Sequence, residues 1–332
     1  MTVPTQNVYY FGMEDYPRTI VEFNERFATE EACLRYLETF RWPCGFRCPY
    51  CGHDKSWETK DGLHKCGKCY QRTSVTAGTI FHGTRKPLRF WFQAMWHITS
   101  QKYGANALGL QRVLALGSYH TAWEWLHKLR RAMVRPDRDN LSDTVEVDET
   151  YIGGECSGKR GRGAENKALV VIAVEDKGGM RGKGIGRIRL QHIPNASAKS
   201  LIGFISTHVT LGSLIRTDGW TGYEPLESAG YKHIVVGPTE LALAHLIASL
   251  LKRWLLGTYQ GAVEPSHLDY YLDEYTFRFN RRTSASRGKL FYRLVQQAVI
   301  TGPVHGQDIV GGVPIVKPGS TDLQKELPDT PS

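Results

Sequence analysis

The stretch TVEVDETYIGG, residues 144–154, indicates the fold of the larger half of this chain. Apolar and polar residues alternate along it, as they do in a β-strand with one buried face. Val145 and Val147 would face one side of the sheet, and Glu146 and Asp148 the other. Two glycines end the strand. The stretch therefore predicts a strand that carries an acidic residue close to its end.

Four further strand patterns and two helix patterns follow. The strand patterns are ALVVIAVED (168–176), GRIRLQHI (186–193), SLIRTDGW (213–220) and KHIVVG (232–237). A helix pattern at 197–209 separates the third strand from the fourth, and another at 240–256 follows the fifth. Three consecutive strands, a crossover helix, a strand and a helix are typical of a mixed α/β sheet of the ribonuclease-H type.

A second acid ends the fourth strand. Asp218 follows an apolar strand and precedes Gly219. An ordinary aspartate of a turn would occupy the same position. In a ribonuclease-H-like sheet the first and fourth strands are neighbours. Asp148 and Asp218 would then lie side by side, and paired carboxylates suit a hard cation such as Mg²⁺.

The helix after the fifth strand offers a third ligand, His245. Lys252 follows seven residues later, about two helical turns, so the two side chains share one face. The alternative interpretation is a histidine at the edge of the core and a lysine that reaches to solvent.

The cysteines predict a metal site. Five of the seven lie between residues 44 and 69. Cys48-x-x-Cys51 and Cys66-x-x-Cys69 supply four thiolates at the spacing of a zinc ribbon, and such a closed shell indicates one structural zinc ion. The substitute ligands would be Cys44, His53 and His64.

Residues 87–135 show helical patterns. Two helices separated by Gly117-Ser118 follow the helix-turn-helix plan, in which the second helix enters the DNA major groove. Any two packed helices would give the same pattern. On this plan the basic residues that face outward to DNA are Lys128, Arg130 and Arg131. The glycine-rich loop 157–167 adds further candidates for DNA binding, Lys159, Arg160 and Arg162, or is a solvated hairpin tip.

The composition suggests a polyanionic partner. The 332 residues carry a formal charge of +9, which clustered phosphates would attract, although ribosomal or membrane-surface attachment fits the charge equally well. No run approaches the roughly 18 apolar residues of a membrane span, and the first twenty residues lack a signal pattern. We expect a cytoplasmic protein without a membrane partner.

These patterns divide the chain into five predicted segments. They are an N-terminal helical segment (1–43), a zinc ribbon (44–82), a helical helix-turn-helix-like DNA-binding region (83–140), a ribonuclease-H-like catalytic domain (141–300) and a disordered tail (301–332).

Four motifs together resemble the bacterial insertion-sequence transposases of the DDE superfamily: VEVDETYIGG, TDGWTGY, LLKRWLLGTYQGAV and HLDYYLDEYTFRFNRR. The resemblance covers about residues 20–300. It is closest to the subgroup with an N-terminal zinc ribbon and a lysine after the third catalytic residue.

The resemblance implies two divalent ions, Mg²⁺ or Mn²⁺, in a site that cleaves and joins DNA strands. Asp148 and Asp218 match the two aspartates and Lys252 matches the lysine. His245 stands at the third position, where most members have glutamate and this subgroup accepts glutamate, asparagine or histidine. Glu240 is the nearest acid, but it lies off the face of Lys252.

The implied partners are the double-stranded DNA of transposon ends and targets, bound by a homo-oligomer that associates with the nucleoid. Two alternatives remain at this point. The chain would be a DNA-binding protein with an inactive nuclease-like domain, or a nuclease that cuts DNA and does not join it.

Overall fold

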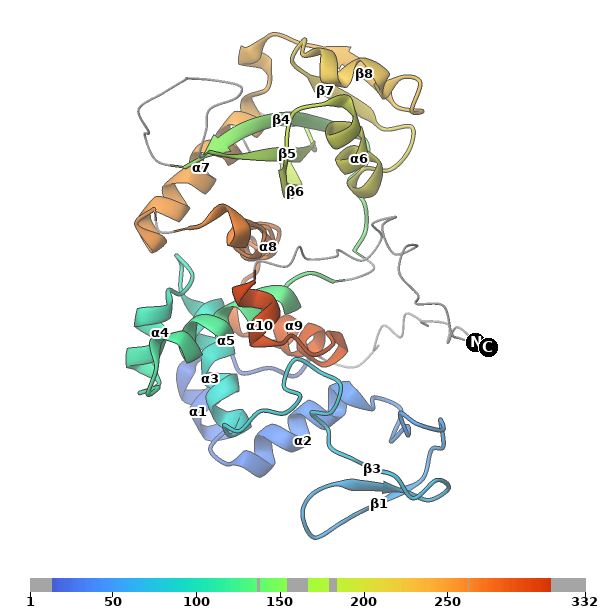
Figure 1. Cartoon of the computed structure of the whole chain (residues 1–332), viewed down its shortest axis with the longest axis vertical. Coiled ribbons are helices and arrows are strands. Elements are labelled where there is room, and N and C mark those ends of the chain that lie inside the picture. Colours follow the sequence, from blue (N-terminus) through green and yellow to red (C-terminus); the bar gives the residue numbers. More distant parts are fainter. Residues whose placement is uncertain (1–13, 136–137, 154–166, 179–183, 262, 312–332) are drawn as a thin grey trace.

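The computed structural model describes residues 14–135, 138–153, 167–178, 184–261 and 263–311. A five-stranded sheet with its helices forms one end of the molecule, and a small three-stranded ribbon forms the other (Figure 1). A body of helices lies between them. The region with predicted zinc ligands is thus far from the sheet that carries Asp148.

The five-stranded sheet has the strand order β6-β5-β4-β7-β8. Its strands are β4 (Thr144–Ile152), β5 (Ala168–Asp176), β6 (Ile185–Ile193), β7 (Leu214–Thr217) and β8 (Lys232–Val235). Strands β4, β5 and β6 are antiparallel neighbours, whereas β7 runs parallel to both β4 and β8. This mixed sheet is the predicted ribonuclease-H-like arrangement, with the first and fourth strands adjacent.

Helices cover both faces of the sheet because its central strands alternate between two buried sides. Val145 and Val147 pack on the face covered by α6 (Ala198–His208) and the short helix η1 (Thr221–Leu226). The opposite face packs against α7 (Ala242–Tyr259) and α8 (Leu268–Phe279). A further short helix, η2 (Pro238–Glu240), precedes α7, and η3 (Pro265–His267) precedes α8.

The helical body has a core rich in aromatic side chains. Its helices are α1 (Ile20–Arg26), α2 (Glu30–Arg41), α3 (Leu88–Ser100), α4 (Ala107–Val113), α5 (Tyr119–Ala132), α9 (Arg287–Ile300) and α10 (Gly306–Val310). The hydroxyl of Thr29 accepts a hydrogen bond from the Ala32 amide and caps α2.

Two elements near the C-terminus join this body. Helix α9 packs against α2, α3 and α5, although the predicted boundaries place it with the sheet. Helix α10 lies within the segment expected to be disordered; Ile309 is fully buried, and its carbonyl lies 2.8 Å from the Nε2 atom of His267. The five segment boundaries themselves stay a prediction.

Helices α4 and α5 are the two helices predicted on either side of Gly117-Ser118. The side chains of Asn106 and Ser118 cap the two helices by accepting amide hydrogen bonds. Helix α5 is enclosed by α3, α8, α9 and α10 as well as by α4, so little of its length faces solvent.

The ribbon consists of β1 (Ser56–Glu58), β2 (His64–Cys66) and β3 (Arg72–Thr73), paired antiparallel in that order. In the part of the chain that the structure describes, no helix has the length and apolar character needed to cross a membrane.

Candidate functional site

The parallel pairing of β4 and β7 places Asp148 beside Asp218. Glu146 pairs with Arg216, and each aspartate lies two residues further along the chain, Asp148 within β4 and Asp218 directly after β7. The Asp148 side chain is 19% exposed. Burial raises the pKa of Asp148, and the negative charges of Glu149 and Asp218 raise it further, while the Glu149 amide and His245 oppose the rise. Two acids whose charges repel in this way favour a cation between them.

His245 lies in the first turn of α7 and reaches this pair of acids. Its Nε2 atom is 3.2 Å from Oδ2 of Asp148, and its side chain is 50% exposed. Lys252 is exposed two turns further along α7. The structure therefore brings Asp148, Asp218 and His245 together beside the two central strands β4 and β7, at the start of α7. Glu240 ends η2 and is also exposed, and its carbonyl accepts a hydrogen bond from Arg216.

Glu146 fixes the start of α7. Its carboxylate is buried, and its Oε2 atom accepts hydrogen bonds from the amides of Leu243 (2.9 Å) and Ala244 (3.0 Å). The helix lacks a side-chain cap from its own N-cap residue, Leu241, so Glu146 satisfies two of its free amides from a neighbouring strand. It thereby positions His245, the next residue of the helix. We did not predict this role, because in the sequence Glu146 is one more polar position of an alternating strand.

The loop after β7 is fixed by Trp220. Its amide donates to Oδ1 of Asp218 (3.1 Å), and its indole Nε1 donates to the carbonyl of Ala196 (2.7 Å). On the other face of β4, the hydroxyl of the buried Tyr223 donates to Oε2 of Glu149 (2.7 Å). The neighbour of Asp148 in β4 and the loop that follows Asp218 are therefore both held in place.

The donor set of two carboxylates and one imidazole fits a divalent metal ion. Asp148, Asp218 and His245 are nevertheless less tightly gathered than the cysteines. Among the described residues, only the four cysteines form a group of metal-binding side chains whose ligand atoms all lie within 4.8 Å of one another.

The four cysteines converge as their spacing predicted. Sγ of Cys48 lies 3.6 Å from Sγ of Cys69, and Sγ of Cys51 lies 3.5 Å from Sγ of Cys66. A tetrahedral zinc ion with bonds of about 2.3 Å separates its sulfur ligands by about 3.8 Å, so the donors fit zinc. The substitute ligand His64 lies 3.0 Å from Glu38 and stacks on Phe46 instead.

The expected DNA-binding residues of α5 need one correction. Arg130 does not face outward: it is 1% exposed, and its Nε atom donates to Glu274 of α8 at 2.9 Å. The prediction was wrong because α8, distant in sequence, covers that side of α5. Lys128 and Arg131 are half-buried. The basic residues Lys159, Arg160 and Arg162 lie outside the described residues.

Residues 140–280 match the model of the ISXO2-like transposase domain, and residues 28–72 match that of the transposase zinc-ribbon domain. Together the matches cover more than half of the chain. The chain belongs to the ISXO2-like transposase family. Both parts expected from the resemblance, the zinc ribbon and the DDE domain, are thus present in this transposase.

Two solved structures are distantly similar to this transposase. The Mos1 transposase paired-end complex with the left transposon end is 12% identical over 70% of this chain and 81% of that chain, with a TM-score of 0.28. The Mos1 strand transfer complex is 13% identical over 71% and 82% of the two chains, with a TM-score of 0.26. Similarity at this level adds nothing to the assignment. None of the curated proteins matches the chain.

Proposed function

We propose that this transposase cleaves DNA at transposon ends and joins the 3′ ends to target DNA, using Asp148, Asp218, His245 and Lys252. The observation that carries the proposal is the 3.2 Å contact between His245 and Asp148, beside the parallel pairing that aligns Asp218. Asp148, Asp218 and His245 come from three separate segments, and Lys252 lies about two helical turns beyond His245 on α7.

Each residue has a role that follows from its chemistry. Asp148 and Asp218 would hold Mg²⁺ or Mn²⁺, and His245 would supply a third ligand from α7. Bound divalent ions supply an activated water or 3′-hydroxyl and stabilise the leaving oxygen. Lys252, exposed on the same helix, contacts a phosphate of the bound DNA. Glu146 is a positioning residue, because it contacts α7 and not the reacting groups.

Double-stranded DNA is the proposed partner. The net charge of +9 favours a phosphate backbone, and the family is one of transposases. We assign recognition of the ends to the zinc ribbon and the helical region, with Lys128 and Arg131 retained as candidates. The side chain of His120, 61% exposed at the start of α5, is the more accessible position on that helix. We further propose a homo-oligomer assembled on DNA and one structural zinc ion on Cys48, Cys51, Cys66 and Cys69.

The test is strand cleavage and joining by the purified chain. DNA that carries the flanking inverted repeats is incubated with Mg²⁺ or Mn²⁺, and the products are separated on a denaturing gel. Asp148→Asn should remove both activities. Asp143→Asn is the matched control, because this acid lies just before β4 with its side chain 74% exposed and contacts Lys177.

Three outcomes are distinguished. Joined products that depend on Asp148 support the transposase. Cleavage without joining indicates a nuclease, and binding of the ends without cleavage indicates an inactive DNA-binding protein; either result would overturn the proposal.

A further inference from the structure

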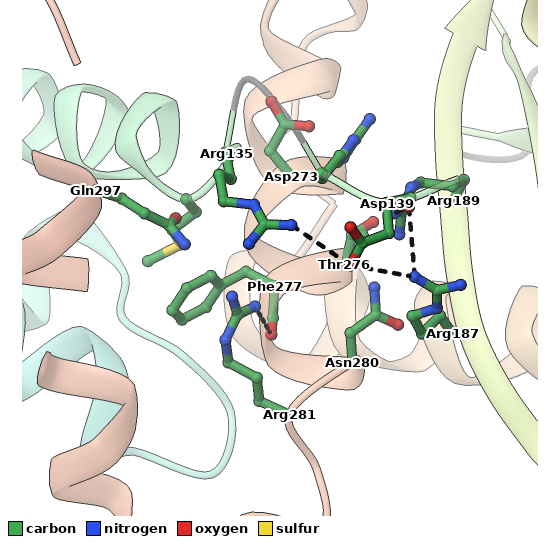
Figure 2. Close-up of a pocket in the computed structure, with 12 residues that line it drawn as sticks. Arg135, Asp139, Arg187, Arg189, Asp273, Thr276, Phe277, Asn280, Arg281 and Gln297 are labelled. Atoms are coloured by element: carbon green, nitrogen blue, oxygen red, sulfur yellow. Dashed lines mark hydrogen bonds and ion pairs between the residues drawn. The ribbon is translucent and has the colours of Figure 1, made fainter. Parts of the chain in front are cut away.

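A pocket lined with arginines lies where the helical body meets the sheet. Its volume is about 290 Å³, close to the lower end of the roughly 300–1,000 Å³ of small-ligand pockets. Its five arginines come from three segments: Arg135 and Arg138 from the segment after α5, Arg187 and Arg189 from β6, and Arg281 from the residues after α8. Figure 2 shows Arg135 and Arg281 on one side and Arg187 and Arg189 on the other. The lining also contains two acids, Asp139 and Asp273.

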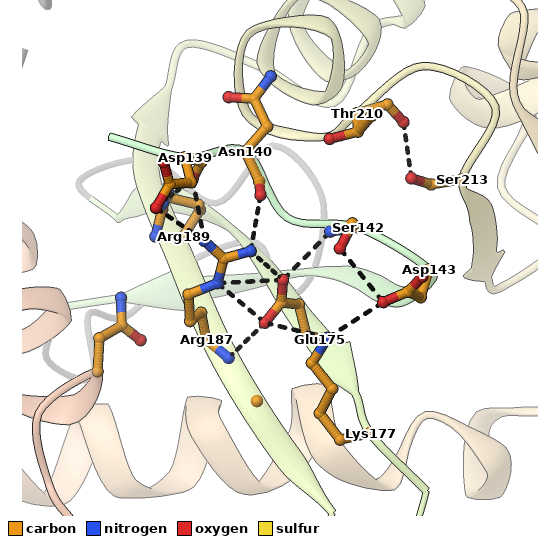
Figure 3. A network of polar contacts seen from close by, with 12 residues as sticks. Asp139, Asn140, Ser142, Asp143, Glu175, Lys177, Arg187, Arg189, Thr210 and Ser213 are labelled. Carbon is orange, nitrogen blue, oxygen red and sulfur yellow. Dashed lines mark hydrogen bonds and ion pairs between the residues drawn. The ribbon is translucent and has the colours of Figure 1, made fainter. Parts of the chain in front are cut away.

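One of these arginines is already neutralised. Arg187 donates to both oxygens of the buried Glu175, at distances from 2.5 to 3.1 Å, and to the carbonyls of Asp139 and Asn140 (Figure 3). This network attaches the segment before β4 to β6. It explains Arg187 as a structural residue and removes it from the charge available to a ligand.

Arg189, which is buried, and Arg281, which is half-buried, have no acid partner in the part of the chain that the structure describes. Arg189 is 4% exposed and donates only to carbonyls, those of Ile188 (2.9 Å) and Asp139 (2.5 Å). Arg281 donates to the carbonyl of Phe277 (3.1 Å) and lies 4.0 Å over that ring. Burial lowers the pKa of Arg189 to about 9, with Arg138 and Arg187 adding to the effect, and lowers that of Arg281 to about 10.

The acids in the lining do not balance these charges. Asp139 lies 3.4 Å from Arg135, but its side chain is 75% exposed, and such pairs contribute little. Asp273 is near Arg138 and opposes the lowering of its pKa by burial. With Arg187 and Glu175 set aside, four guanidinium groups remain against two carboxylates. The pocket thus has an excess of positive charge that burial makes costly.

We propose that this arginine pocket binds a phosphate group. A phosphate presents several acceptor oxygens in different directions, which suits guanidinium groups that arrive from separate segments. The phosphate comes either from the DNA backbone or from a free phosphate or nucleotide. The first source rests on the proposed function, because it requires that the chain bind DNA; the second does not.

The test compares three variants of the full chain. Arg138→Gln and Arg281→Gln each remove one charge from the pocket. Arg282→Gln is the matched control, because Arg282 is adjacent in sequence, is exposed, donates to the carbonyl of Gly186 (3.2 Å) and does not line the pocket. Circular dichroism confirms that each variant is folded.

Two measurements separate the sources. Inorganic phosphate is titrated at constant ionic strength, with chloride as the balancing anion. Binding of a random-sequence DNA duplex is measured from 50 to 300 mM salt. We expect each pocket variant to weaken phosphate binding about tenfold, the loss of one charge-assisted hydrogen bond, and the control to bind like the parent chain.

If the phosphate comes from the DNA backbone, each arginine removed should also lower the slope of the logarithm of duplex affinity against the logarithm of salt concentration by about 1. Weaker phosphate binding with an unchanged slope would assign the pocket to a free phosphate. The proposal is overturned if both pocket variants match Arg282→Gln in both measurements. Cleavage plays no part in either readout, so an inactive enzyme that keeps phosphate binding would count against the proposed function alone.

Discussion

The two candidate metal sites of this transposase are built in opposite ways. The four cysteines come from one short stretch, residues 48–69, and their ligand atoms already lie within 4.8 Å of one another. Asp148, Asp218 and His245 come from β4, the end of β7 and the start of α7, and the Nε2 atom of His245 lies 3.2 Å from the Asp148 carboxylate. The cysteine site is formed within one short stretch and leaves no open ligand position. The site of Asp148, Asp218 and His245 is assembled by the sheet and remains open.

The difference follows from what each site has to do. A structural zinc ion needs no vacant position, so two short turns that close on it are sufficient. A site that acts on DNA must admit a phosphate, so its ligands have to be held by something other than the metal. Here the strand pairing, the Glu146 contact with α7 and the Trp220 contact with Asp218 hold them. Metal removal should therefore unfold the ribbon and leave the sheet unchanged.

The largest effect is expected from the aspartates. Asp148→Asn or Asp218→Asn removes an anionic ligand at nearly constant size, and DNA cleavage should fall by at least about 1,000-fold, equivalent to roughly 4 kcal/mol of transition-state stabilisation. The melting temperature should stay within a few degrees of the parent chain. If either variant cleaves at more than a tenth of the normal rate, that residue is not a metal ligand.

In the ribbon, by contrast, loss of a metal ligand should affect folding. Cys66→Ser should release the zinc ion and unfold residues of the ribbon, because zinc binding supplies about 10–16 kcal/mol in small zinc modules. Elemental analysis and proteolysis of the ribbon would measure both changes. Cys44→Ser is the matched control, since Cys44 lies outside the four-cysteine group. Retention of zinc by Cys66→Ser would contradict a four-cysteine site.

His245 should have an intermediate effect that depends on the metal. His245→Ala should lower cleavage by roughly 100-fold, about 2.7 kcal/mol, without unfolding the chain, because the side chain is half exposed. Imidazole prefers later first-row metals to Mg²⁺, so the parent chain should favour Mn²⁺. His245→Glu should stay active and narrow the difference between the cleavage rates in Mn²⁺ and in Mg²⁺. If His245→Ala cleaves normally while the aspartate variants are inactive, the third ligand is elsewhere, and Glu240 is the first residue to test.

Glu146 should have the smallest effect and should act through position. Glu146→Ala removes the acceptor for two amides of α7, and we expect cleavage to fall about tenfold with weaker metal binding. Glu146→Gln keeps one carbonyl oxygen as an acceptor and should restore most of the cleavage activity and most of the metal binding. A melting temperature that falls in both variants without any change in metal affinity would mean that Glu146 stabilises the fold only.

Patterns within single segments predicted the structure well. The alternation of residues 144–152 and the apolar run 168–176 give the bounds of β4 and β5 as observed. The cysteine spacing predicted the ribbon for the same reason, because its ligands are close in the chain. Asp148 and Asp218 were aligned by strand order, which the succession of strands and helices indicates.

Features that depend on distant segments were missed. The sequence of α5 shows a basic stripe, but α8 covers Arg130, and Glu274 neutralises it across 144 residues of chain. The same holds for the arginine pocket, whose members are ordinary surface residues when each segment is read alone. Glu146 reads as one more polar position of an alternating strand until α7 is placed against it. Periodicity shows that a face is buried and does not show what buries it.

The place of α9 in the core also dictates an order of events during protein synthesis. Phe291 of α9 packs among the rings of Phe23, Phe27, Tyr36, Phe92 and Trp96, which leave the ribosome much earlier. In the sequence, the strands of the sheet lie between the N-terminal helices of the helical body and α9. The core of the helical body therefore cannot form completely until residue 291 has left the ribosome. The strands of the sheet are complete by residue 235, so the sheet can fold first on the nascent chain. The N-terminal aromatic residues pack fully only after Phe291 has been synthesised.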